Sequence, residues 1–405
     1  MKIALLTNLY PPLSRGGAEK VAQRIVGELK RRGHDVFVIS TKLYDGWSSF
    51  RLSRELMSAT RVYRLRPINL YHPLFDYRHI FPVRALWHLM DLFFPCNTQQ
   101  ICRLLEEEKP DIILTHNLKG LSLRLPKMIR SLCLPWIHTI HDVQLSIPSG
   151  LLFYGQHNWL NRSFLQRWYQ YCVRGIFGSP NVVIFPSTYV KDFYQKRGFF
   201  SHSTLRVIPN PAPPFEPRPR GKRQTGPLRL FFAGQLEKHK GILFLLRVLA
   251  RTDVPFHLHI AGEGTLMPQV SKMCEQDPRF FYHGFLSLED IQDWFAVSDA
   301  AIVPSLCYEN SPTIIYESLQ SGVPVIASKI GGVGELIQEG VNGYLFEPGN
   351  RKDLLRCLKE LDEQKEFFWS CAGQIRSTVE PYVLDHYLDS LEKMMRSLLP
   401  PLPSS

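Results

Sequence analysis

Short apolar runs alternate with helical stretches along this chain, and the alternation constrains its fold more than any other feature. The first run, Ile3 to Leu6, is followed by a glycine-containing loop, a helical stretch over 18–32 and a second run over 36–39. A strand, a loop, a helix and a strand in this order predict a right-handed βαβ unit and a parallel sheet. We therefore expect residues 1–208 to form an α/β, doubly wound, Rossmann-like domain. Further apolar runs of this half lie at 111–115, 136–140 and 181–185.

A second series of apolar runs follows a proline-rich segment. Residues 209–227 contain seven prolines and few apolar residues, a composition typical of a linker. We expect a second doubly wound domain over 209–380, and a C-terminal helix within 381–405 that crosses back to the first domain. The apolar runs of the second series lie at 228–233, 256–260, 300–303 and 323–327.

Ligands of doubly wound sheets bind at the carboxyl ends of the strands, where the strand order reverses. Two such domains are expected to face each other across a cleft that the loops after their strands line. Residues that carry function are therefore expected in these loops.

The positive charge is concentrated in the first half. The formal net charge is +11, yet residues 1–208 hold 28 Lys and Arg against 13 Asp and Glu, whereas 209–405 hold 20 against 24. This asymmetry points to a polyanion or a membrane surface near the first half. Residues 51–94 add seven arginines and eight aromatic residues, which fit an anionic lipid surface. A domain-specific insertion with solvated arginines is the alternative.

Several classes of protein are disfavoured. No apolar run reaches the roughly 18 residues that a membrane span requires, and the N-terminus lacks the pattern of a secretory signal. The eight cysteines stand singly, so neither a zinc site nor a disulfide framework is indicated. No nucleic-acid-binding motif accompanies the basic charge. We expect a cytoplasmic protein, with peripheral contact at the inner face of the cytoplasmic membrane.

The first half offers two candidate sites. Gly16 and Gly17 stand before the first helix, where the backbone can approach an anion and the helix N-terminus offers unpaired N–H groups. A plain tight turn is the alternative. Alternation turns His138 and His141 to opposite faces, so His141, at the end of its run, is the better candidate for the cleft. His116 occupies a similar position after another run, and for each histidine a buried, satisfied side chain is the alternative.

The second half offers glycine turns after its first two strands. Gly234 follows one strand, and Lys240 precedes a helix, where it would supply a positive charge for a phosphate. A solvated lysine is the alternative. Gly262 belongs to another glycine turn at the same edge.

The segment 303–317 is the most specific. Glu309 and Glu317 are eight residues apart after a predicted strand. Ser311 is expected to cap the next helix, and Pro312 to be its first residue. The N–H groups of that helix can bind phosphate or sugar oxygens, and the carboxylates can accept hydrogen bonds from hydroxyls. The chain contains no Asp-x-Asp, so no metal bridge to a diphosphate is indicated.

Taken together, these motifs resemble glycosyltransferase family 4 (group 1), retaining enzymes of the GT-B fold, over nearly the whole chain. The resemblance implies transfer of a sugar from a UDP- or GDP-sugar to an acceptor hydroxyl, with no metal or other cofactor. It also implies an anionic or lipid-linked saccharide acceptor, in cell-surface polysaccharide, lipopolysaccharide or glycolipid biosynthesis. In chain order the motifs are Gly16-Gly17, His141-Asp142, Ser187 with Val190, Asn210, Gly234 to Gly241, Gly262 to Gly264, His283 to Phe285, Glu309 to Glu317, Gln320 to Ser328 and Gly331 to Glu335.

The resemblance also implies residue roles. Glu309 would face the sugar ring, His141 would bond a donor-sugar hydroxyl, and Lys240 would stabilise the leaving diphosphate. His116 and Arg15 would contact the acceptor. Within the donor site, Glu317 would hold the ribose, and Phe285 with Leu286 would bound the base. The implied donor-binding residues are Gly16, Gly17, Gly234, Gln235, Lys240, Gly262, Phe285, Leu286, Ser311, Pro312, Thr313 and Glu317.

One position departs from the family pattern. Such enzymes usually carry an arginine after the first glycine of the 234–241 segment, and this chain has Gln235. Glutamine supplies no charge, so Lys240 or Arg15 would carry more of the phosphate binding. The substitution also favours the rival hypothesis, a non-catalytic sugar-nucleotide-binding protein of the same fold.

Overall fold

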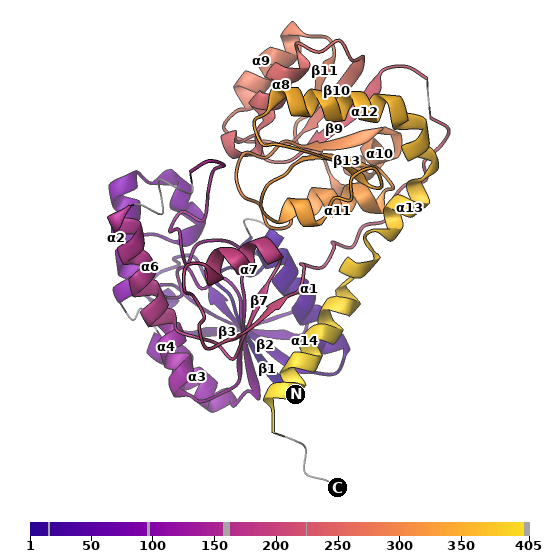
Figure 1. Ribbon diagram of the computed structural model, residues 1–405. Helices are drawn as coiled ribbons and strands as arrows, with labels where there is room; N and C mark the ends of the chain where they lie inside the picture. The colour runs from indigo at the N-terminus through magenta and orange to yellow at the C-terminus, as the bar shows by residue number, and fades with distance from the viewer. Residues whose placement is uncertain (15–16, 95–97, 157–162, 224, 401–405) are drawn as a thin grey trace. The chain divides into compact units, whose positions relative to one another are not determined.

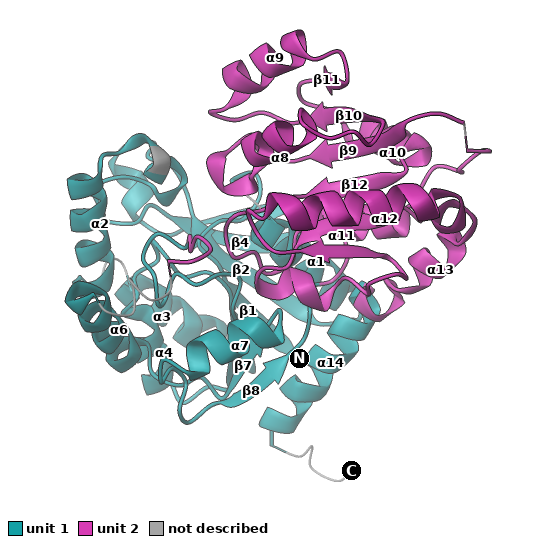
Figure 2. Cartoon of the chain, turned by 45° about the horizontal axis from the view of Figure 1, so that its top comes forward, with its two compact units in different colours: residues 1–150, 158–210, 384–405 teal, residues 151–157, 211–383 magenta. Residues whose placement is uncertain are grey.

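A computed structural model describes residues 1–14, 17–94, 98–156, 163–223 and 225–400. The chain forms two compact α/β units, shown in Figure 2, each built on a largely parallel sheet. The fold class is therefore the predicted one. Unit 1 comprises residues 1–150, 158–210 and 384–405, and unit 2 comprises 151–157 and 211–383.

Unit 1 is built on an eight-stranded sheet in the order β3-β4-β2-β1-β5-β6-β7-β8. The β3–β4 pair is antiparallel, and the other neighbouring pairs are parallel. The strand order reverses at β1, so the loops after β1 and β5 are adjacent, and the Asn8 amide donates to the Asn117 carbonyl at 2.7 Å. The strands are β1 Lys2–Leu6, β2 Asp35–Thr41, β3 Ser53–Met57, β4 Thr60–Leu65, β5 Ile112–Thr115, β6 Trp136–Thr139, β7 Val182–Phe185 and β8 Thr204–Val207.

Helices cover this sheet, as Figure 1 shows, and the side chains that they bury against it are apolar. In α1, Val21, Ile25 and Leu29 recur at helical spacing and are buried, and Gly33 leaves the helix with φ +86°. None of the helices that the structure describes is both long enough and apolar enough to cross a bilayer. The helices of unit 1 are α1 Gly17–Arg31, α2 Phe81–Phe93, α3 Thr98–Glu108, α4 Leu125–Ser131, α6 Phe164–Phe177, α7 Thr188–Gln195 and α14 Leu384–Leu398.

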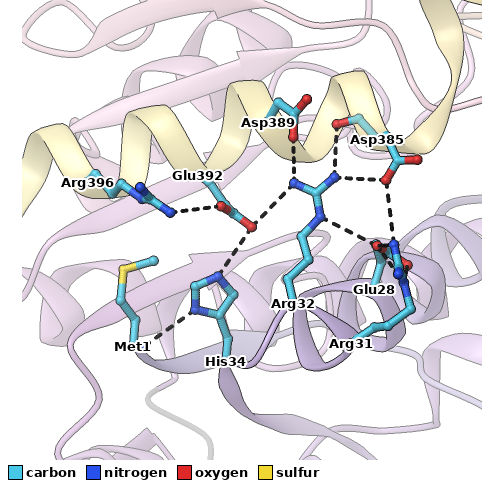
Figure 3. A network of polar contacts seen from close by, with 9 residues as sticks. All are labelled: Met1, Glu28, Arg31, Arg32, His34, Asp385, Asp389, Glu392 and Arg396. Carbon is cyan, nitrogen blue, oxygen red and sulfur yellow. Dashed lines mark hydrogen bonds and ion pairs between the residues drawn. The ribbon is translucent and has the colours of Figure 1, made fainter.

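The C-terminal helix α14 belongs to unit 1. Its apolar side chains, among them Tyr387 and Leu391, are buried in the core of that unit. On its polar side, Asp385 and Asp389 accept hydrogen bonds from the guanidinium of Arg32 at 2.8 and 2.6 Å. Glu392 bonds Arg32 and His34 as well (Figure 3). Apolar burial and an ion-pair network together hold this distant segment against α1.

Unit 2 is built on a six-stranded sheet, β11-β10-β9-β12-β13-β14, in which the neighbouring strands are parallel. Its order reverses at β9, so the loops after β9 and β12 are adjacent. The strands are β9 Leu228–Ala233, β10 Phe256–Ala261, β11 Phe280–Tyr282, β12 Ala300–Val303, β13 Val325–Ser328 and β14 Gly343–Phe346. The helices are α8 Ile242–Leu249, α9 Met267–Gln276, α10 Leu288–Val297, α11 Thr313–Gln320, α12 Arg351–Ser370 and α13 Ala372–Ser377.

The proline-rich segment is not a free tether. Its Ala212 amide donates to the Tyr382 carbonyl at 2.7 Å, and Arg220 donates to two carbonyls of unit 2 while stacking 3.7 Å from the Trp369 ring. Arg223 and Asp299 form a buried ion pair at 2.7 Å. The segment that joins the two units is therefore packed on unit 2, because arginines anchor residues whose apolar content is low.

A short piece of the first half also joins unit 2. Residues 151–156 lie beside the loop after β12, where the Tyr154 amide donates to the Leu306 carbonyl at 2.9 Å. The Tyr308 amide donates in return to the Leu152 carbonyl at 2.8 Å. The predicted first domain, residues 1–208, included this piece.

Candidate functional site

Two glycine turns meet at the carboxyl edge of the unit 2 sheet. Gly262 has φ +130°, and a Cβ at this residue would lie 1.9 Å from the Gly234 carbonyl oxygen. The Gly234 amide donates to the Ala261 carbonyl at 3.0 Å. The turns after β9 and β10 are thus packed backbone to backbone, which only a glycine at position 262 permits. They present main chain to the space above the sheet.

Lys240 and Glu309 form an ion pair at the same edge. Lys240 ends a 3-10 turn, and its Nζ lies 2.8 Å from Oε2 of Glu309. The Ser305 hydroxyl donates to the other carboxylate oxygen. Burial alone would lower the pKa of Lys240, but the Glu309 carboxylate outweighs it and raises that pKa above its ordinary value. Lys240 is therefore a fixed cation, paired with Glu309. The sequence predicted separate ligand contacts for the two residues, Lys240 with a phosphate and Glu309 with the sugar.

The loop after β13 fixes the backbone of Glu309. Gly331 has φ +60°, and a Cβ there would lie 2.2 Å from the Glu309 carbonyl oxygen. That oxygen accepts a hydrogen bond from the Gly332 amide at 2.8 Å. Ser305 and Gly331 are thus positioning residues to which the sequence assigned no role. Gly331 lies in a glycine-rich motif, and that motif is the signal that could have identified it.

Helix α11 starts one residue later than predicted. Pro312 is its N-cap, with φ −64° and ψ 122°, and Thr313 is its first residue. The extended ψ of Pro312 keeps it out of the helix, and the Ser311 hydroxyl pairs with the Tyr316 hydroxyl at 2.8 Å instead of capping. The assignment of Ser311 as N-cap is therefore wrong. Glu317, on the same short helix, is half-buried.

The other predicted donor residues of unit 2 lie in loops. Phe285 is 75% exposed between β11 and α10, whereas Leu286 packs against the core. Ser287 then caps α10 in a reciprocal capping box with Asp290. Gln235 is exposed on the turn after Gly234. These loops therefore present the aromatic ring of Phe285 and the uncharged amide of Gln235 to a ligand.

In unit 1, His116 and His141 stack on one another. They follow β5 and β6, their ring centroids are 5.0 Å apart, and Nδ1 of His116 lies 2.7 Å from Nε2 of His141. Burial lowers the pKa of His141 to about 4, and burial with the neighbouring histidines lowers that of His116 well below its ordinary value. Both rings are neutral at pH 7. His116 is 2% exposed and its ring contacts that of His141, so its predicted contact with an acceptor stays a prediction.

A small pocket of about 30 Å³, partly open to solvent, adjoins His141 and has room for one or two waters. Asp91, from α2, has its pKa raised to about 7 by burial, and it accepts a hydrogen bond from the Gly120 amide at 3.0 Å. Burial also raises the pKa of Asp142 to about 6. The sequence assigned no role to Asp91, since a single Asp within an apolar helix carries no signal, whereas Asp142 belongs to the His141-Asp142 motif. The cavity is lined by residues that include His88, Asp91, Lys119, His138, His141, Asp142, Tyr169 and Tyr194.

Three predicted residues precede or begin the first helix. Gly17 is the first residue of α1. Arg15 and Gly16 lie outside the described residues. The predicted anion contacts at this turn therefore stay predictions.

Two family models match the chain. Residues 15–214 match the model described as Glycosyltransferase Family 4, and residues 227–364 match the model described as Glycosyl transferases group 1. A 42.6 kDa protein in the cps region of Klebsiella pneumoniae is 24% identical over 366 residues, 90% of this chain and 95% of that protein. A glycosyltransferase of Methanocaldococcus jannaschii is 25% identical over 370 residues, 86% of each chain.

Solved structures share the fold. Sucrose-phosphate synthase from Thermosynechococcus elongatus matches with a TM-score of 0.72 at 17% identity, over 98% of both chains. The lipopolysaccharide outer core galactosyltransferase WaaB matches at 0.68 and 17% identity, over 98% of this chain and 100% of the other. Anabaena HepE in complex with UDP matches at 0.67 and 16% identity, with the same coverage. The fold common to these proteins and this chain is GT-B.

Proposed function

Since the chain belongs to the glycosyltransferases of family 4 and group 1, we propose that it transfers a hexose from a UDP- or GDP-sugar to a saccharide hydroxyl with retention at the anomeric carbon. The observation that carries the proposal is the Lys240–Glu309 ion pair at the carboxyl edge of the unit 2 sheet. It sets a fixed cation beside two bare glycine turns, at the edge where doubly wound sheets bind nucleotides.

The donor would bind unit 2. Its diphosphate would lie against the main chain of Gly234 and Gly262, with Lys240 and the first N–H groups of α11 facing its charge. Lys240 is 27% exposed, so a ligand can reach it. Phe285 would cover the base and Glu317 would accept hydrogen bonds from the ribose. The chain has no Asp-x-Asp, and we propose that the fixed cation takes the place of a bridging metal.

A front-face displacement accounts for retention. The bond from the anomeric carbon to the diphosphate breaks while the acceptor oxygen bonds that carbon on the same face, and the acceptor proton passes to a diphosphate oxygen. Glu309 would not be the nucleophile, because Lys240 and Ser305 already engage both of its carboxylate oxygens. His141, neutral at pH 7, would hydrogen-bond a donor-sugar hydroxyl.

The acceptor would be an anionic or lipid-linked saccharide of a cell-surface polysaccharide, a lipopolysaccharide or a glycolipid. The basic charge of residues 1–208 supports an anionic acceptor at the cytoplasmic face of a membrane. The positions of two similar proteins, one in a cps region and one in lipopolysaccharide synthesis, support the same class.

A donor screen tests the proposal. UDP- and GDP-sugars are incubated with the purified chain, with and without a cell-lipid extract, and nucleoside diphosphate release is measured. We expect release with one donor that rises when the extract is present, and a product that keeps the anomeric configuration. A donor that binds in calorimetry but is never turned over, with any acceptor fraction, would instead identify a non-catalytic sugar-nucleotide-binding protein.

A further inference from the structure

The outer faces of α2 and α6 expose many large apolar side chains. On α2, Phe81 is 81% exposed, and on α6 Phe164 and Leu165 are 79% and 74% exposed. Each helix already has a separate buried face, with Trp87 in α2 and Phe177 in α6 fully inside unit 1. The exposed side chains are therefore not needed for packing within the unit. The full exposed set is Ile80, Phe81, Leu86, Leu89, Phe93, Phe94, Phe164, Leu165, Trp168 and Tyr171.

These side chains form one surface. The two helices lie side by side in Figures 1 and 2, and the rings of Phe93 and Trp168 bridge them with centroids 6.0 Å apart. Four of the ten residues are phenylalanines and two more are Trp and Tyr, and aromatic side chains favour a membrane–water interface. We refer to this set of ten residues as the α2–α6 face. Such a contiguous apolar surface marks an interaction site.

The charge around the α2–α6 face is positive. Between residues 78–94 and 163–178 the chain has one acidic residue, Asp91, and it is 2% exposed on the inner side of α2. The same two stretches contain four arginines, at 78, 84, 167 and 174, of which Arg84 pairs with the buried Asp76 at 3.3 Å. Aromatic and aliphatic side chains surrounded by arginines, without exposed carboxylates, complement a surface of negatively charged headgroups over an apolar interior.

We infer that the α2–α6 face docks on an anionic lipid bilayer, with the apolar side chains inserted at the headgroup level and the arginines against phosphates. The inference deepens the proposed function, on which its link to the acceptor rests, by naming the surface that meets the membrane. A protein partner of ordinary composition would be expected to meet mixed charges, and this face offers cations alone.

The same helices also wall the cavity beside His141. Asp91 and His88 reach it from α2, and Tyr169 reaches it from α6. Each helix thus has one face toward the candidate site and one face toward solvent. A bilayer on the outer face would bring a lipid-linked acceptor within reach of the unit that holds His141.

Vesicle co-sedimentation of the full chain, without donor, tests the docking. Vesicles of phosphatidylglycerol with phosphatidylethanolamine are compared with phosphatidylcholine vesicles. We expect binding to the anionic vesicles only, and a loss of at least fivefold in the Phe81→Glu/Leu165→Glu double variant. The matched control, Met267→Glu/Phe367→Glu, changes two exposed apolar residues of unit 2 and should bind as the unchanged chain does.

Several results would overturn the inference. They are equal binding to both kinds of vesicle, no binding to either, unchanged binding of the Phe81→Glu/Leu165→Glu variant, or a dimer in solution that this variant abolishes while vesicles stay unbound. Turnover of a water-soluble acceptor is measured in parallel and should be unchanged in that variant. Vesicle binding without any turnover would contradict the proposed function alone, and turnover without vesicle binding would contradict the docking alone.

Discussion

The Nε2 atom of His141 lies 2.7 Å from Nδ1 of His116, and the two neutral rings are stacked. One nitrogen of this contact must carry the hydrogen and the other must accept it, so the tautomer of each ring constrains the other. His116 is buried, and His141 is the ring that lines the cavity. We therefore expect His141 to contact a ligand and His116 to position His141.

Substitutions should separate these two roles. We expect His141→Ala to lower kcat by about 10²-fold or more, since a hydrogen bond to the reacting sugar is lost. His116→Ala should lower it by a smaller factor, and His116→Asn should restore part of the loss. UDP affinity by calorimetry should stay within about twofold in all three, because UDP carries no sugar and would bind unit 2, whereas these residues lie in unit 1. Near-unchanged turnover in His141→Ala would remove it from the active site.

Asp91 should make stability depend on pH. Burial raises the pKa of its carboxyl from 3.8 to about 7, so between these values the folded state holds a proton that the unfolded state has lost. The contribution of this proton to the free energy of unfolding is complete below pH 3.8 and is lost as the pH rises through about 7. Asp91→Asn keeps the acceptor for the Gly120 amide and has no proton to lose.

Between pH 5 and pH 8, the free energy of unfolding of the unchanged chain should therefore fall by roughly 2–3 kcal/mol relative to that of Asp91→Asn. Urea denaturation at the two pH values measures the difference. Asp45→Asn, at an exposed position, is the control and should show no such change. A constant difference between Asp91→Asn and the unchanged chain would show that Asp91 is ionised throughout.

The sequence predicted the central strands and missed the edges, for a physical reason. Buried parallel strands such as β1 and β7 are continuous apolar runs, which the pattern reveals. Strand β3 is an edge strand with four of five residues exposed, so it has no apolar run. In β4, Arg61 and Arg64 interrupt the pattern, and their ion pairs with Glu108 and Glu55 depend on distant segments.

The candidate site could be predicted in part. The glycine turns and the helix of Glu317 follow from strand-then-loop spacing, because parallel strands end at one edge. The pairing of Lys240 with Glu309, which is 69 residues away, could not be predicted from the sequence, since it depends on how the Gly241 turn packs against the loop after β12. Likewise, nothing in the local sequence of His116 shows that it is buried behind His141.

Glu317 should contribute to donor affinity. We expect Glu317→Ala to weaken UDP binding by about tenfold in calorimetry, because the ribose hydroxyls lose a charged hydrogen-bond acceptor. Glu363→Ala, on the exposed side of α12, is the control and should bind UDP normally. If Glu317→Ala keeps full affinity for the nucleotide that the unchanged chain binds, the ribose assignment is wrong.

Arg32 should stabilise the docking of α14. It is 19% exposed and lies between Asp385, Asp389 and Glu392 (Figure 3). We expect Arg32→Met to lower the free energy of unfolding by about 1 kcal/mol in low salt, because both aspartates are largely exposed and the pairs are partly screened. The loss should shrink in 1 M NaCl. Equal losses at both salt concentrations would assign the effect to packing of the side chain.

The Lys240–Glu309 pair allows the sharpest test of the donor site, because its two members should behave differently. Lys240→Ala removes the cation that would face the diphosphate, so UDP affinity should fall by about tenfold or more, whereas Lys238→Ala in the same turn should change it by less than twofold. Glu309→Gln leaves Lys240 without its carboxylate partner, so UDP binding should be kept or strengthened while kcat falls. Weaker UDP binding in both Lys240→Ala and Glu309→Gln would mean that the pair holds the loop in place and does not face the diphosphate.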